Sequence, residues 1–136
     1  MSNDNYEDVG EFHDRFGLRA FTHGPAPEGI SDELLEFRTK FMQEELQEFI
    51  DASETMDHAG MADALIDLVY VALGTAHMFG YPWRDLWNDV QRANVSKVRV
   101  MSAAQSARGS AFDVIKPEGW QPPITAHILR EVGFDL

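Results

Sequence analysis

The sequence predicts an all-α fold, an antiparallel helical bundle of about five helices formed by a single domain over residues 1–136. Apolar residues recur with the helical period of 3.6 in several segments, and no stretch alternates with the period of two that is typical of a half-buried strand. Segments rich in glycine and proline separate these helical patterns. A chain of 136 residues is long enough to bury a hydrophobic core.

The first half of the chain carries clear start and stop signals. A short helix is expected over about residues 4–16, followed by a loop over residues 17–29 with three glycines and two prolines. Ser31 is a suitable N-cap for a long helix that extends to about Met56. Residues 57–60 are interpreted as a turn, and a third helix is expected from Met61 to Phe79, ending at Gly80.

The second half is expected to hold two further helices and an irregular segment. Pro82 suits the first turn of a fourth helix, which extends to about Lys97. Residues 98–121 are mostly irregular, and the part near residues 100–112, rich in Ser, Ala and Gly, is expected to be mobile. Pro122 or Pro123 opens a last short helix that stops at Gly133.

Composition excludes several classes of function. The chain has no cysteine, which rules out disulfides, zinc–thiolate sites and thiol nucleophiles. Its net charge of −12 and pI of about 4.6 argue against binding to nucleic acid or to an anionic membrane. The polar, acidic N-terminus does not resemble a signal peptide, and the apolar run over residues 64–79 is judged too short and too interrupted to span a bilayer. A cytoplasmic location is therefore expected.

Acidic residues on the second and third helices form the main candidate site. Asp67 is the only charged residue in the apolar run of residues 64–73, and a helix that is apolar on nearly every side is expected to be buried. Glu48 lies ten residues before His58 and Asp67 nine after it, so in an antiparallel hairpin both stand about 14 Å from the turn. The remaining acids on these faces are Glu44, Glu45 and Asp63.

Carboxylates converging at one level suit a hard cation, namely magnesium, manganese or calcium. Zinc or copper is not expected, because the cluster holds neither cysteine nor histidine, and the calcium loop of an EF-hand is absent. Two other interpretations remain open. By themselves the glutamates are more typical of a solvated helix face, and Asp67 is equally compatible with a buried aspartate that pairs with an arginine or a tyrosine hydroxyl.

The motifs resemble those of the all-α nucleoside triphosphate pyrophosphohydrolases of the MazG-like group, which includes phosphoribosyl-ATP pyrophosphohydrolases and dimeric dUTPases. The resemblance is to the small, phosphoribosyl-ATP pyrophosphohydrolase-like members of phages and bacteria. It rests on Glu44-Glu45-x-x-Glu48 and on residues 11–13, 67–70, 74–75, 92–97 and 116–120. One departure is that the family's usual Glu-x-x-Asp is absent: Ala64 stands three residues before Asp67, and the nearest acid is Asp63.

The resemblance implies hydrolysis between the α- and β-phosphates, giving a nucleoside monophosphate and pyrophosphate with Mg²⁺, or Mn²⁺ in its place. It implies that Glu45 and Glu48 are catalytic. The implied metal ligands are Glu44, Glu45, Glu48, Asp63 and Asp67, and the implied substrate-binding residues are His13, Arg92, Asn94, Lys97 and Lys116. Because the substrate is a polyanion, an acidic site needs both metal and nearby cations.

The expected substrate is dUTP or another surplus or non-preferred nucleotide. A phosphoribosyl-ATP pyrophosphohydrolase of histidine biosynthesis is the close alternative, although that family usually has His where Val71 stands. A non-catalytic helical metal-binding protein is the other. We also expect a homodimer or a dimer of dimers, since the third helix and Trp83 and Trp87 of the fourth present more apolar surface than one short chain covers.

Several of the substrate-binding candidates have plainer interpretations. Arg92 and Lys97 lie near a helix C-terminus, where cations are favoured electrostatically. Lys116 begins a turn that packs Trp120 on the body, and His13 is also compatible with a half-exposed surface histidine.

Overall fold

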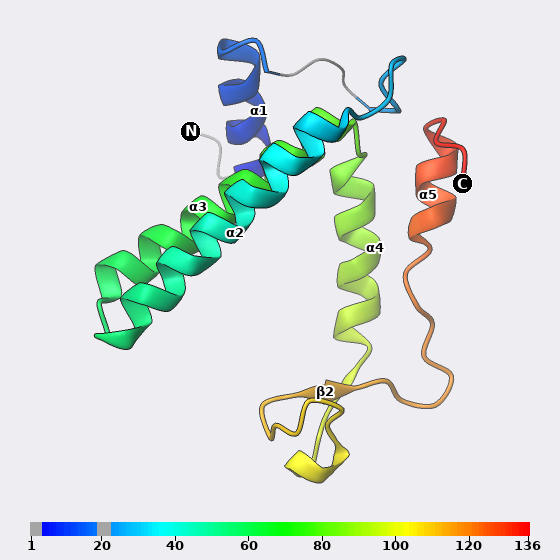
Figure 1. The fold of residues 1–136 in the computed structure, drawn as a ribbon. Coiled ribbons are helices and arrows are strands. Elements are labelled where there is room, and N and C mark those ends of the chain that lie inside the picture. The colour runs from blue at the N-terminus through cyan, green and yellow to red at the C-terminus, as the bar shows by residue number, and fades with distance from the viewer. Residues whose placement is uncertain (1–3, 19–22) are drawn as a thin grey trace.

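The computed structural model describes residues 4–18 and 23–136, and within them it confirms the all-α fold. The described residues form five α-helices: α1 (Asn5–Arg15), α2 (Asp32–Glu54), α3 (His58–Phe79), α4 (Trp83–Val95) and α5 (Thr125–Glu131). A short 3-10 turn, η1 (Ala103–Gln105), lies between two strands, β1 (Val98–Arg99) and β2 (Val114–Ile115). Figure 1 shows an open arrangement, in which α2 and α3 form one arm and α4 leads away from it to the strands.

The α2–α3 arm is an antiparallel helical hairpin with a defined cap at each start. Ser31 caps α2 as predicted, because its Oγ accepts a hydrogen bond from the Leu34 N–H at 3.1 Å. Asp57 caps α3 by accepting from the Gly60 N–H at 3.1 Å, so α3 begins at His58 and the turn predicted over residues 57–60 is wrong. Gly80 ends α3 as predicted, in the left-handed conformation with φ of 74°.

Three helices meet at Gly74, where α1 and α2 pack against α3. A Cβ at Gly74 would lie 2.4 Å from His13 Nε2 and 2.8 Å from Arg38 Nη2, so only glycine lets both side chains approach. Arg38 is buried, and it donates to the Val71 carbonyl at 2.9 Å and to Thr75 Oγ1 at 3.0 Å. His13 is also buried, which makes the expectation of a half-exposed histidine wrong.

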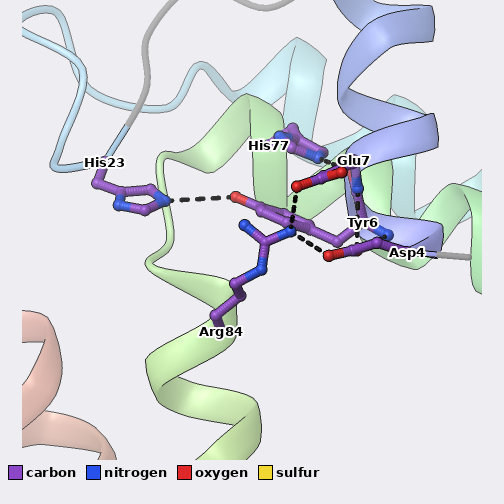
Figure 2. A network of polar contacts seen from close by, with 6 residues as sticks. All are labelled: Asp4, Tyr6, Glu7, His23, His77 and Arg84. Carbon is purple, nitrogen blue, oxygen red and sulfur yellow. Dashed lines mark hydrogen bonds and ion pairs between the residues drawn. The ribbon is translucent and has the colours of Figure 1, made fainter. Parts of the chain in front are cut away.

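A polar network joins the start of α1 to α3 and α4 (Figure 2). Arg84 of α4 pairs with Asp4 and with Glu7, the latter at 3.0 Å, and its guanidinium lies 5.4 Å from the centre of the Tyr6 ring. The ring of His77 also stacks on the Tyr6 ring, with 3.9 Å between their centroids. His77 Nε2 donates a hydrogen bond to the Tyr6 carbonyl at 2.7 Å. This network fixes the corner from which α4 departs.

The second arm consists of α4, the strands and α5. The strands pair antiparallel, with Val98 opposite Ile115, in a segment that was expected to be irregular. Asp113 closes the hairpin by accepting from Ser106 Oγ and from Arg108, and the mobility expected near residues 100–112 stays a prediction. Beyond it, α5 begins two to three residues later than predicted, because Ile124, and neither proline, is its N-cap.

The chain exposes 9664 Å² of surface, whereas a compact monomer of 15.4 kDa is expected to expose about 7,200 Å². Exposed apolar residues contribute to this surface, and those on the α2–α3 arm include Phe37, Ile66 and Val69. The whole of α3, at 22 residues, is long and apolar enough to cross a membrane by length and composition alone, although the apolar run over residues 64–79 is shorter. The core helix of a soluble protein meets the same criterion, and α3 packs against both α1 and α2.

Candidate functional site

Three carboxylates converge midway along the α2–α3 arm. Glu45 and Glu48 stand one turn apart on α2, and Asp67 projects from α3. Each offers a carboxylate oxygen, and these three oxygens lie within 4.8 Å of one another. The structure thus confirms the register inferred from the spacing, which placed Glu48 and Asp67 at the same level across the hairpin.

Burial within this carboxylate trio is the reverse of what the sequence suggested. Glu45 is the buried member, with 7% of its surface exposed, whereas Asp67 is exposed. The expectation of a buried Asp67 is wrong because it rested on the apolar residues around it in sequence. Leu65, Ile66 and Val69 are themselves exposed in the single chain, so their apolar character does not cover the neighbouring carboxylate.

One oxygen of the buried Glu45 carboxylate has no hydrogen-bond partner among the described residues. Its Oε2 is buried and accepts no hydrogen bond within the described part of the chain. The pKa of Glu45 is raised to about 7, first by burial and then by the hydrogen bond and negative charge of Glu48 and by the charges of Asp67 and Glu44. A divalent cation among these oxygens would supply the missing partner and offset the repulsion, so the residues present fit a hard metal ion.

The other two predicted ligands lie outside this group. Glu44 acts on Glu45 through its charge alone, and Asp63 stands one turn before Asp67 on α3, where it offers no oxygen within 4.8 Å of all three. Both side chains are exposed. A four-residue spacing therefore keeps Asp63 on the face of Asp67 without bringing it into the cluster.

Arg92, a predicted substrate ligand, takes part in a structural network. Its Nε donates to Asp89 at 2.9 Å and its Nη2 donates to the Pro122 carbonyl at 3.2 Å. Asp89 also accepts from the Ile124 N–H at 2.6 Å, so the pair ties α4 to the start of α5. The Arg92 guanidinium holds the pKa of Asp89 below its usual range. Asn94, the neighbouring candidate, is exposed on the last turn of α4.

Lys97 and Lys116 are brought together by a residue that the sequence had assigned only to packing. Their ammonium groups lie 5.4 Å and 4.9 Å, respectively, from the centre of the Trp120 ring. Trp120 is itself anchored, because its Nε1 donates to the Ala93 carbonyl at 2.7 Å. The structure thus groups two of the five predicted substrate-binding residues, whereas His13 is buried elsewhere, at Gly74.

A family model described as phosphoribosyl-ATP pyrophosphohydrolase matches residues 9–94, which is more than half of the chain. The chain belongs to this family. It is therefore a pyrophosphohydrolase of the MazG-like fold, a family that typically binds a divalent metal. The matched residues include the whole carboxylate trio and end before Lys97, Lys116 and Trp120. No curated protein matches the chain.

Proposed function

We propose that the protein is a magnesium-dependent nucleoside triphosphate pyrophosphohydrolase that cleaves between the α- and β-phosphates. The observation that carries the proposal is the carboxylate trio inside the family-matched region, with the unpartnered Oε2 of Glu45 at its buried end. Glu45, Glu48 and Asp67 would hold the metal. When bound, Mg²⁺ would neutralise phosphate charge and activate water for attack on the α-phosphorus.

The glutamates also suit the proton transfer that this hydrolysis needs. Water attack forms a bond from oxygen to the α-phosphorus and breaks the bond from that phosphorus to the bridging oxygen, so that pyrophosphate leaves. The proton of the attacking water goes to a carboxylate, and Glu45 and Glu48 are the candidates because they adjoin each other on α2.

The phosphates need cations, and the nearest grouped pair stands on the other arm. Asp67 lies about 20 Å along α3 from Gly80, and Lys97 lies at least about 20 Å along α4 from Pro82. Figure 1 shows the α2–α3 arm and α4 diverging from the turn between α3 and α4. A triphosphate therefore cannot reach from the carboxylates to the lysines of the same protein chain.

A second copy would complete the site, and we propose a homodimer or a dimer of dimers in which the lysines of one chain approach the carboxylates of another. The surface exposed beyond that of a compact monomer amounts to about 2,500 Å². A stable interface needs only about 800 Å² from each partner. The exposed apolar residues of α2 and α3 provide a surface of the kind that such interfaces bury.

There are two candidates for the substrate. We favour dUTP or another surplus nucleotide, because Val71 stands where the histidine-biosynthetic enzymes usually have histidine. The description of the matching family favours phosphoribosyl-ATP. A screen that measures pyrophosphate release from both compounds and from the common nucleoside triphosphates decides between them.

The product tests the chemistry itself. Phosphorus NMR of the reaction should show pyrophosphate and a monophosphate. Release of orthophosphate and a diphosphate would contradict cleavage at the α-phosphate. Asp67→Asn should abolish activity and Asp63→Asn should retain it, since only Asp67 belongs to the trio.

A further inference from the structure

We infer that Trp120 is a positioning residue, whose ring holds the ammonium groups of Lys97 and Lys116 as one binding site for a polyphosphate. The part of this site in catalysis rests on the proposed function, but its capacity to bind the anion does not. The three residues lie outside the segment that the family model matches, so the family match does not assign them.

The backbone places the two lysines opposite each other. Val98 of β1 pairs with Ile115 of β2 in an antiparallel register. Lys97 directly precedes Val98 and Lys116 directly follows Ile115, so they continue the same register by one position. Like charges at directly opposed positions of a strand pair are destabilising. Two of the three lysines in the chain nevertheless occupy this pair of positions.

Nothing in the described part of the chain neutralises this pair. No carboxylate lies within the 4.0 Å of an ion pair from either ammonium group, although Lys97 is only half-exposed. Each ammonium group lies over the Trp120 ring, at 5.4 Å and 4.9 Å from its centroid, where the π-electrons attract a cation. The ring orients the charges and leaves them unneutralised, which is the arrangement an anionic ligand requires.

The anchoring of Trp120 makes the site rigid. The indole N–H donates to the carbonyl of Ala93, a residue with no exposed surface, so the ring is fixed to the last turn of α4. Fixed cations bind an anion at a smaller entropic cost than free lysine side chains do. In a chain with a net charge of −12, a ligand must carry several charges to be retained by two lysines, and a chain of phosphates meets this condition.

Binding of inorganic tripolyphosphate to the wild-type protein in EDTA tests the inference. Without metal the carboxylate trio repels the anion, so binding reports on cationic residues, and the Trp120 signal reports on the lysine pair beside it. We expect the indole N–H signal of Trp120, assigned by its loss in Trp120→Phe, to shift during the titration. The signals of Trp83 and Trp87 at the other end of α4 serve as internal controls and should stay in place. An unshifted Trp120 signal would overturn the proposal.

Variants separate positioning from packing. Lys97→Gln and Lys116→Gln should each weaken tripolyphosphate binding about tenfold, as loss of a charged hydrogen bond does. Lys40→Gln, which removes an exposed lysine of α2, should not change it. Trp120→Leu should weaken binding about threefold or more although both lysines remain, and Trp120→Phe should restore part of it, since phenylalanine keeps the ring but loses the N–H that anchors it.

The outcomes distinguish this inference from the proposed function. Equal binding by wild-type protein and Trp120→Leu would exclude a positioning role, as would a loss in Trp120→Phe equal to that in Trp120→Leu. If Trp120→Leu does not fold, the wild-type titration and the lysine variants still decide. With substrate and magnesium, Trp120→Leu should raise KM and leave kcat near its wild-type value. Tripolyphosphate binding in a protein that hydrolyses no nucleotide would support the site and refute the activity.

Discussion

Replacement of Asp67 by Asn should stabilise the metal-free protein and at the same time remove its response to magnesium. The three carboxylate oxygens lie within 4.8 Å of one another, and at that distance in water each pair of charges repels by at least about 0.9 kcal/mol. Asp67→Asn removes two such pairs at a pH where Glu45 is ionised. After screening by about 0.1 M salt the gain is about 1 kcal/mol, or about 3–5 °C in Tm for a chain of this size.

The assay is thermal unfolding at pH 8 in EDTA and again with excess MgCl₂. Wild-type protein should melt at a higher temperature with magnesium, since a ligand that binds only the folded state stabilises it by mass action. Asp63→Asn removes the same charge one turn away on α3 and should keep the magnesium response. A lower Tm for Asp67→Asn in EDTA, or an undiminished rise with magnesium, would refute the shared-site interpretation.

Two further perturbations test the packing and the electrostatics. Gly74→Ala should lower the unfolding free energy by about 1–2 kcal/mol in chemical denaturation, because overpacking against His13 and Arg38 exceeds the helix-propensity gain of about 1 kcal/mol. A second substitution, His13→Ala, should relieve this overpacking. A stabilised Gly74→Ala variant would contradict the close contact. In EDTA, ionisation of Glu45 should lower the unfolding free energy as pH rises from 4.5 through 7, since folding raises its pKa from 4.5 to about 7. Glu45→Gln should remove this part of the pH dependence. An unchanged pH profile in Glu45→Gln would contradict the raised pKa.

The fold was predictable where local signals and tertiary packing agree. Ser31 and Gly80 mark helix ends correctly, because a cap residue acts on its own neighbours in the chain. Asp57 is also a suitable N-cap residue, and placing it within a turn sets the expected start of α3 three residues too late. The strand pair went unrecognised because each strand has only two residues, too few to show a period.

The candidate site was predictable in its register and not in its environment. Helical rise fixes the level of Glu48 and Asp67 from the sequence alone. Which carboxylate is buried depends on how α2 and α3 rotate toward each other, and spacing does not determine that rotation. Arg38 was missed for the same reason, although an arginine two turns before Glu45 on a face that enters the hairpin could have signalled a buried cation.

The separation of acids and lysines on two arms leads to a test of the shared site. If each site takes its carboxylates from one chain and its lysines from another, Asp67→Asn chains are inactive, Lys97→Gln chains retain about a tenth of the activity at substrate concentrations below KM, and the two are complementary. A mixed dimer has one site in which both contributions are intact and one in which both are lost. After unfolding and refolding an equal mixture, half of the dimers should be mixed, and activity should recover to about a quarter of the wild-type value. No recovery, with mixed dimers verified by mass spectrometry, would show that each chain builds its site alone.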